Sequence, residues 1–327
     1  MELRGPAGGS DESPIESGTL ACSACETEYP IRGYIPRFVD SENYASSFGF
    51  EWRQHARTQL DKFNGTTVSK ERFFRETGWA EDLSGQRILE VGCGSGRFTQ
   101  VALDTGAEVF SIDYSDAVDV SLENNGPHSG LTLAQADLYA LPFKPGTFDK
   151  VFCIGVLQHT PRVKEAFLGL LPYLKESGEI VIDVYAKSWE SYFTPKYWMR
   201  TITKRLPKGF LYSAVTRITP LLLPIKVWLR KNTPAVGRYV AGIVPVANFS
   251  GMYHLSRRQL LEWSILDTFD DLSPQYDSPQ RLDEVRHWFE EPPLTDVLVN
   301  IVSPGIIRGR GVRGAGQPAQ KRVLTRT

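Results

Sequence analysis

Residues 87–113 read RILEVGCGSGRFTQVALDTGAEVFSID, and this stretch decides the fold. The apolar run at 87–91 has the length of a buried strand, and a glycine-rich turn follows it at 92–96. Residues 97–104 have the spacing of a helix, and a second apolar run at 108–112 ends at Asp113. A strand, a tight turn, a helix and another strand in this order predict a parallel sheet covered by helices.

The same alternation continues along the chain. Further strands are predicted at 131–136, 149–154 and 179–185, with helices near 116–124 and 163–175. The pattern stops at about residue 186 and returns as a helix at 281–291 and strands at 294–302 and 306–308. We therefore predict an α/β fold: a seven-stranded, mostly parallel, Rossmann-like sheet with helices on both faces, a terminal antiparallel strand and a helical insertion.

The glycine-rich turn has the features of a ligand site. In an open parallel sheet, ligands bind at the carboxyl ends of the strands. Gly92, Gly94 and Gly96 let a ligand touch the backbone, and the free N–H groups of the next helix face it. Asp113 ends the second strand, where a carboxylate can accept both hydroxyls of a ribose, and Asp137 follows the third strand, placed for an adenine amino group.

These elements resemble the class I S-adenosylmethionine-dependent methyltransferases, in particular the small-molecule branch that includes ubiquinone and menaquinone methyltransferases. The resemblance is close over 87–185 and looser over 280–308, and it does not cover 186–279. It implies S-adenosylmethionine as the cofactor. The implied reaction is methyl transfer, at oxygen or carbon, to a small-molecule or lipid- or sugar-linked acceptor.

The resemblance also assigns roles to single residues. The resemblance places Glu90, Ile154 and Gly155, together with the three glycines, at the methionine end of the cofactor. Those that it places at the ribose and the adenine are Asp113, Tyr114, Asp137 and Leu138. The acidic Glu90 is expected to act through backbone and water contacts.

Two other functions stay open. A dinucleotide-dependent oxidoreductase has the same kind of sheet, but it prefers the pattern G-x-G-x-x-G, and the third glycine here comes one residue early. A methyltransferase-like scaffold would bind the cofactor without turnover, because a fold does not fix a function.

Candidate catalytic groups follow the fourth and fifth strands. His159 is placed to act as a base, although it could equally cap the following helix. Asp183 and Tyr185 end a strand at the same rim, where either could instead only pack or hydrogen-bond. His254, within the insertion, is a further candidate. The acidic segment 267–277 is interpreted as a solvated loop near the substrate opening.

The predicted organisation has six parts. Residues 1–40 form an N-terminal arm with a disordered start at 1–19, and residues 41–80 form an aromatic helical cover over the cofactor that includes Phe48 and Trp52. Residues 81–185 form the cofactor-binding core, 186–279 the insertion on the substrate side, 280–308 the last helix and strands, and 309–327 a disordered tail.

Cys22 and Cys25 resemble the second half of a small zinc-binding segment that precedes some bacterial methyltransferases. A closed zinc site needs four ligands, and this region supplies two, so we expect no metal. The segment is instead expected to pack against the core through the apolar side chains of Tyr29, Ile31, Ile35 and Phe38.

Charge is segregated along the chain. Residues 191–261 contain twelve basic residues and no Asp or Glu, although the whole chain balances 37 basic against 38 acidic residues. The apolar segment 212–230 within this region is interpreted as too interrupted by Pro220 and Pro224 to span a bilayer. It could lie on an anionic membrane or meet an anionic substrate, or it could complete the core or a dimer contact.

Composition sets the remaining expectations. No run of 18 uninterrupted apolar residues and no apolar signal core are present, and four cysteines are too few for a disulfide scaffold. We expect a cytoplasmic protein, with peripheral contact at a membrane as the open alternative. No nucleic-acid partner is expected, and the oligomeric state is left open.

Overall fold

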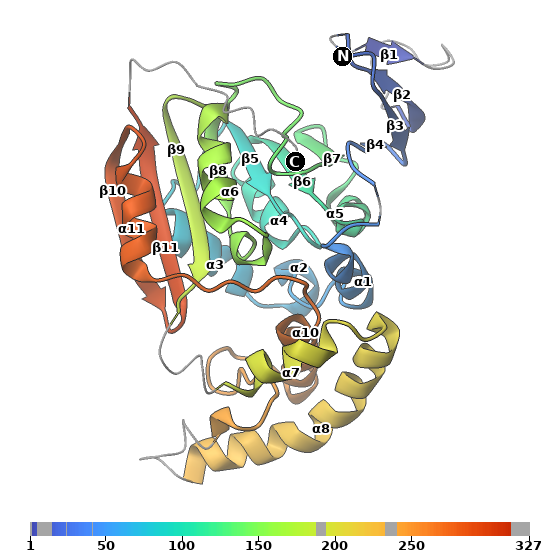
Figure 1. The fold of residues 1–327 in the computed structure, drawn as a ribbon, viewed down its shortest axis with the longest axis vertical. Helices are drawn as coiled ribbons and strands as arrows, with labels where there is room; N and C mark the ends of the chain where they lie inside the picture. Colours follow the sequence, from blue (N-terminus) through green and yellow to red (C-terminus); the bar gives the residue numbers. More distant parts are fainter. Residues whose placement is uncertain are drawn as a thin grey trace.

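The computed structural model describes residues 2–4, 15–23, 25–40, 42–187, 194–232 and 241–314. Seven strands form one sheet in the order β10-β11-β9-β8-β5-β6-β7 (Figure 1). Their bounds are β5 Arg87–Val91, β6 Glu108–Asp113, β7 Leu131–Gln135, β8 Phe148–Cys153, β9 Leu174–Tyr185, β10 Leu294–Ser303 and β11 Ile306–Arg313. Strands β9, β8, β5, β6 and β7 are parallel, and β11 is antiparallel to both of its neighbours. The predicted sheet is confirmed.

Two strands are longer than predicted because a neighbouring strand pairs with the extra residues. β9 begins at Leu174, which pairs with Phe148 at the start of β8. The preceding helix therefore ends early, as α6 (Val163–Leu170) and a 3-10 turn at Leu171–Tyr173. β11 continues to Arg313, since it pairs with β9 along its length. Residues 309–313, expected in a disordered tail, thus belong to the sheet, and 315–327 lie outside the described residues.

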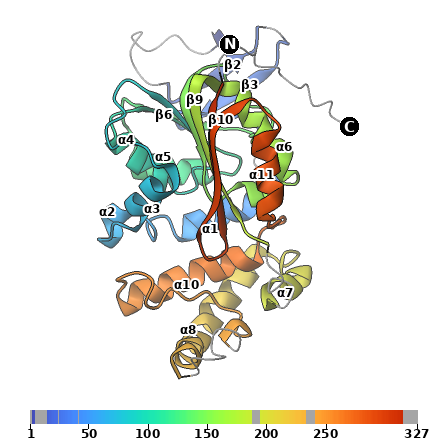
Figure 2. The ribbon, with the colours of Figure 1, turned by 90° about the vertical axis from the view of Figure 1, so that its left-hand side faces the viewer.

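Helices cover both faces of the sheet. Figure 2 shows α6 and α11 (Leu282–Glu290) on one side of the strands, and α3, α4 (Arg97–Asp104) and α5 (Ala117–Asn125) on the other. Phe167 of α6 stacks on Phe289 of α11 at 4.5 Å between ring centroids, within the core of the first face. On the second face, Phe73 of α3 and Phe98 of α4 pack on Phe152 of β8. Two separate apolar layers therefore hold the sheet.

The N-terminal arm is a small antiparallel sheet of β1 (Glu2–Arg4), β2 (Ser17–Ala21), β3 (Glu28–Arg32) and β4 (Ile35–Pro36). The prediction that 1–19 is disordered is wrong for residues 2–4 and 17–19, because β1 and β3 both pair with β2. The arm packs on the main domain, as expected: Ile35 is fully buried beside Val118 and Leu133, and Arg37 bridges Gln135 at the end of β7.

The segment predicted as a helical cover contains α1 (Ser46–Gln54), α2 (Asp61–Asn64) and α3 (Val68–Thr77). Within its described residues, the insertion contains α7 (Pro195–Thr203), α8 (Lys208–Asn232) and α10 (Arg257–Leu272). It leaves the sheet after β9 and returns at the same place, because Ala186 forms a backbone bridge with Gln280. In both views its helices lie together at the end of the molecule opposite the N-terminal arm (Figures 1 and 2).

The prediction that Pro220 and Pro224 interrupt the segment 212–230 is wrong. Both prolines lie inside α8, which is continuous over 25 residues (Figure 1). A proline removes one N–H donor from a helix, but the rest of the hydrogen-bond ladder and packing against protein can maintain it. Leu211, Val215 and Leu223 form the buried side of α8, and the first two pack on α10. Tertiary contacts therefore outweigh the local cost of the prolines.

The packing of α11 on β11 gives a stability test. A Cβ atom at Gly309 would lie 2.3 Å from Cε2 of Phe289, whose ring is fully buried against Phe167. We expect Gly309→Ala to lower the free energy of unfolding by about 1–3 kcal/mol, because the ring has no free space to move into. Denaturant unfolding measures this change.

Gly209→Ala is the matched control. Gly209 lies in α8, and a Cβ atom there would have no neighbour within 4 Å. Alanine favours a helix by up to about 1 kcal/mol over glycine, so this variant should be neutral or more stable. Equal stability of the two variants would contradict the packing assigned to Phe289.

Candidate active site

The glycine-rich turn joins β5 to α4 and is fixed from two sides. The backbone N–H groups of Gly92 and Cys93 both donate to the carbonyl of Ile112 on β6, at 2.8 and 3.0 Å. Gly94 has a φ of 53°, and a Cβ atom there would lie 2.8 Å from the indole nitrogen of Trp52 on α1. A side chain at this position would therefore be strained and would displace α1. The predicted turn is present at the start of α4, and the indole of Trp52 lies against it at Gly94.

Asp113 is almost completely buried and holds two loops together. Its Oδ2 accepts a hydrogen bond from the backbone N–H of Gly94 at 2.9 Å. Its Oδ1 accepts from the backbone N–H and the hydroxyl of Ser115, at 2.8 and 2.7 Å. Burial raises the pKa of Asp113, and these hydrogen bonds oppose that shift. A carboxylate has about four acceptor positions, so Oδ2 keeps one for a ligand hydroxyl.

Glu90 lies on β5 beneath the glycine turn and is fully buried. Its Oε2 accepts hydrogen bonds from Ser111 of β6 and Thr99 of α4. Burial raises the pKa of Glu90 to about 7, although both hydrogen bonds oppose the shift. The side chain thus links two strands and a helix under the turn, and it supports the loop rather than contacting solvent.

A groove of about 1760 Å³ opens beside the ends of β6 and β7. Tyr114, Gln135 and Asp137 line it, and it continues toward the N-terminal arm. Asp137 accepts a hydrogen bond from the backbone N–H of Tyr139 at 2.9 Å. Leu138 and Ile154 lie with buried side chains in the core, so only their backbones could face a ligand. The groove thus contains Tyr114 and Asp137, the residues predicted for the adenine.

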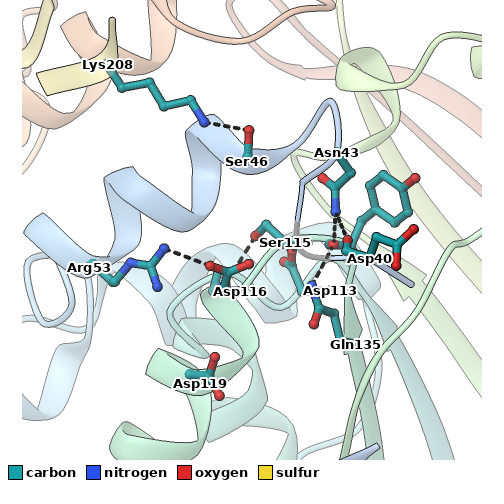
Figure 3. A network of polar contacts seen from close by, with 12 residues as sticks. Asp40, Asn43, Ser46, Arg53, Asp113, Ser115, Asp116, Asp119, Gln135 and Lys208 are labelled. Carbon is teal, nitrogen blue, oxygen red and sulfur yellow. Dashed lines mark hydrogen bonds and ion pairs between the residues drawn. The ribbon is translucent and has the colours of Figure 1, made fainter. Parts of the chain in front are cut away.

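The segment before α1 completes this groove, which the sequence analysis missed. Asn43 donates to the carbonyl of Tyr114 at 2.8 Å, and Gln135 donates to the same carbonyl at 3.2 Å (Figure 3). The ring of Tyr44 lies 4.8 Å from that of Tyr114. A polar residue followed by an aromatic one, near the start of the segment predicted as the helical cover, was the available signal.

Gly155 and Asp183 form the side of the site nearest β8 and β9. Gly155 has a φ of 77°, and the nearest atom to a Cβ there would be the Arg72 guanidinium at 3.9 Å, so this position has open space in front of it. The carboxylate of Asp183 accepts from the Gly155 N–H and forms an ion pair with Arg72 at 2.7 Å. Asp183 therefore positions Gly155, and its charge is balanced by a cation from α3.

His159 ends the 3-10 turn Leu157–His159 that follows β8, and it is buried. Its Nδ1 lies 3.1 Å from the backbone carbonyl of Tyr276. A carbonyl only accepts hydrogen bonds, so in the neutral ring Nδ1 carries the proton and Nε2 keeps a lone pair. This is the tautomer that a base needs, and the ring contacts the Tyr276 carbonyl.

Aromatic rings surround His159. Phe48 of α1 and Tyr185 of β9 lie edge to face with the imidazole, at 5.0 and 5.5 Å between centroids. Phe48 and Trp52 belong to the same helix, so α1 runs from the glycine turn to His159, as the predicted cover should. The structure thus brings His159 and Tyr185 to the glycine-turn end of the sheet.

His254 is not part of this group. It lies in an exposed turn before α10, and among the described residues it forms no hydrogen bond or ring contact with His159, Asp183 or Tyr185. Cys22 and Cys25 lie in the turn between β2 and β3, and the described residues contain no group of three or more metal-ligating side chains.

The interpretation of 267–277 as a solvated acidic loop is wrong. Residues 267–272 belong to α10, and the carboxylates of Asp267 and Asp270 lie near the buried Glu51 of α1. Burial, followed by the neighbouring acids, raises the pKa of Asp267 to about 8. The hydroxyl of Tyr185 donates to Asp270 at 3.5 Å. The acids face the site, because helix periodicity turns them toward α1 and β9 and away from solvent.

The side opposite the adenine groove also contains polar atoms without partners. The side-chain amide of Gln158, one Oε of Glu51 and one Oδ of Asp270 are buried without a hydrogen bond among the described residues. Buried polar groups are normally paired, so unpaired ones indicate a place for water or a ligand. His159, the hydroxyl of Tyr185 and the carboxyl groups of Glu51 and Asp270 lie at this end of the sheet.

Comparison with known proteins identifies the same part of the chain. Residues 89–182 match the family of methyltransferase domains. Ubiquinone biosynthesis O-methyltransferase of Thiobacillus denitrificans is 30% identical over 131 residues, which are 39% of this chain and 56% of that protein. The protein of the same name from Methylococcus capsulatus is 27% identical over 130 residues, 39% and 55% of the two chains.

Among solved structures, the chain is similar to an S-adenosylmethionine-dependent methyltransferase from Mesorhizobium loti. The identity is 24%, the TM-score is 0.32, and 36% of this chain and 54% of the other are covered. The chain spans little more than half the length of the curated relatives it matches. The matched family segment contains the glycine turn, Asp113, Asp137 and His159, and it ends before the insertion.

The contacts of Asp113 give a binding test. We expect Asp113→Ala to weaken binding of S-adenosylmethionine by about 10- to 100-fold, because a hydrogen bond to a charged group contributes roughly 1.5–3 kcal/mol. Isothermal titration calorimetry measures the dissociation constant. Asp82→Ala, in an exposed turn, should bind as the wild type does. Tighter binding of a nicotinamide dinucleotide than of S-adenosylmethionine by the wild type would contradict the site assignment.

The raised pKa of Asp267 gives a pH test. A carboxyl whose pKa is higher in the folded than in the unfolded state stabilises the fold at low pH, and this contribution disappears as pH rises through about 8. Relative to the wild type, Asp267→Asn should therefore gain stability between about pH 5 and pH 8.5, by at least about 1.4 kcal/mol, the value of one pKa unit. Chemical unfolding across this range measures the difference. The variant Glu81→Gln, at an exposed position, should show no such gain. If the stability of Asp267→Asn and that of the wild type changed in parallel with pH, the pKa of Asp267 would not be raised in the folded protein.

Proposed function

Residues 89–182 match the family of methyltransferase domains, and from this premise we propose that the chain is a class I S-adenosylmethionine-dependent methyltransferase acting on a hydroxyl-bearing acceptor. One observation carries the proposal: α1 joins the glycine turn to His159, whose Nε2 has a free lone pair. The cofactor end and a base are thus covered by the same helix.

The described residues fit the cofactor. Gly155 has open space in front of its backbone, Asp113 has an acceptor position left on Oδ2, and Tyr114 and Asp137 line the groove at the adenine side. When bound, S-adenosylmethionine supplies a methyl group activated by its positive sulfur. Binding in this arrangement leaves the side toward His159 for the acceptor.

His159 takes the proton of the acceptor hydroxyl on Nε2 while the Nδ1–H keeps its hydrogen bond to the Tyr276 carbonyl. Removal of this proton makes the acceptor oxygen a better nucleophile. Asp183 and Arg72 hold Gly155 in place, and their ion pair leaves neither as a free base. The chain's own contribution is therefore alignment and proton removal, which suit a displacement at a methyl group.

We place the acceptor between the ends of β8 and β9 and helix α10. Three aromatic rings, those of Phe48, Tyr185 and Tyr44, lie around this space, and Tyr44 also contacts Tyr276 at 5.4 Å. Such walls fit a flat ring or the apolar face of a sugar. The matched family segment ends before the insertion, so we infer that the acceptor of this chain is set by its own α7, α8 and α10. We place the reaction in the cytoplasm, where the free thiols of Cys22 and Cys25 are stable.

The test combines turnover with binding. We expect the wild type to transfer labelled methyl from S-adenosylmethionine to a component of fractionated extract, identified by mass spectrometry. His159→Gln should lower kcat by about 100- to 10,000-fold, as loss of a general base does, while S-adenosylmethionine binds within twofold of the wild type. The matched variant His254→Gln should keep full activity.

Two results would count against the proposal. If His159→Gln turned over as fast as the wild type, His159 would not be the base, and alignment would be the chain's only contribution to the reaction. Cofactor binding by the wild type without a methylated product from any fraction would favour a scaffold that does not turn over.

A further inference from the structure

Helix α8 turns a continuous apolar stripe to solvent. Ile218, Leu221, Ile225 and Trp228 follow one another at spacings of three, four and three residues, which places them on one face of the helix. Their exposed fractions lie between 48% and 70%. Phe210, three turns before Leu221, is exposed to a similar extent. Large apolar side chains in such a row are unusual on a water-facing surface.

Helix α7, which precedes α8 at the same end of the molecule, shows the same feature (Figure 2). Trp198 and Ile202, one turn apart, are 68% and 67% exposed, although Met199 between them packs into the cluster formed with α10. Both helices therefore bury one side against the protein and present another apolar side outward. We call the outward side chains of α7 and α8 the outer face. They are Trp198, Ile202, Phe210, Ile218, Leu221, Ile225 and Trp228.

Positive charge accompanies the outer face. Lys204 and Arg205 follow α7, Arg217 lies beside Ile218, and Arg230 and Lys231 end α8. All five are exposed, and none forms an ion pair within the part of the chain that the structure describes. Because residues 191–261 contain no Asp or Glu, no acid from this segment offsets them.

We propose that the outer face binds the surface of an anionic lipid bilayer, with α8 lying in the plane of the headgroups. Apolar side chains enter the boundary of the acyl chains, tryptophans favour the interface, and lysines and arginines meet lipid phosphates. This inference does not depend on the proposed methyl transfer.

The helix is long and apolar enough to cross a bilayer, but its contacts hold it along the protein. Leu211 and Val215 pack on α10, and Lys226, near the middle of the apolar stretch, donates to the carbonyl of Val244 at 3.0 Å. Spanning would break these contacts and bury the ammonium of Lys226 in hydrocarbon, which is costly. A helix that lies flat on the bilayer keeps its packing on α10 and the hydrogen bond of Lys226.

A second copy of the chain is a poorer partner for the outer face. A two-fold dimer presents the same surface to itself, so the five cations would meet like charges with no acid between them. An anionic bilayer supplies the opposite charge and an apolar layer together. Charge complementarity thus selects the membrane.

Flotation with vesicles tests the inference. The full chain should float with vesicles of phosphatidylcholine containing about one third phosphatidylglycerol at low salt, and should bind pure phosphatidylcholine at least about 10-fold more weakly. Binding should fall as salt rises to about 0.5 M, where charges are screened within a few ångströms. The double variant Leu221→Glu with Trp228→Glu should lower the partition coefficient by about 100-fold.

Ile301→Glu on β10 is the matched control. Ile301 is also exposed, at 55%, but it lies outside the insertion, and this variant should float as the wild type does. All variants should bind S-adenosylmethionine as the wild type does, which shows that they are folded.

The inference is overturned if the wild type stays out of the anionic vesicles at low salt, or if the double variant floats as well as Ile301→Glu does. It is also overturned if light scattering shows a dimer that the double variant disrupts, since a second copy would then cover the outer face.

Discussion

The carboxylate of Asp113 makes hydrogen bonds to two loops at once, and the geometry of the whole cofactor end depends on it. It ends β6, holds the glycine turn of β5 through Gly94, and holds the next loop through Ser115. Without a fixed acceptor, backbone N–H groups at the end of a sheet would turn toward water. The buried carboxylate thus converts a flexible glycine turn into a shaped surface.

Helix α1 connects the glycine turn to His159 and to the insertion. Helix α1 contacts the glycine turn through Trp52 and His159 through Phe48, and Glu51 of the same helix lies near the acids of α10. Burial of several carboxyl groups is unfavourable unless their protons are retained, and the raised pKa of Asp267 has this origin. The region thus combines a glycine turn fixed by Asp113 on the sheet side with a cluster of buried carboxyl groups on the helical side.

The sequence predicted the sheet well, because each strand and helix has a clear period and turn. Residues 87–91 and 97–104 match β5 and α4 residue for residue. The errors occur where distant segments decide the structure. Pairing with β9 lengthens β11, pairing with β2 orders residues 2–4, and packing on α10 keeps α8 continuous through Pro220 and Pro224. The buried positions of Asp267 and Asp270 likewise depend on which side of α10 meets α1, and local composition carries no information on this.

The bridge between Ala186 and Gln280 brings the two ends of the insertion together. The chain leaves β9 and returns beside it, so the two ends are as close as adjacent strands, and a short turn could connect them without moving the sheet. For protein engineering, the same junction marks where recombination between related domains should exchange acceptor preference and leave the cofactor end intact.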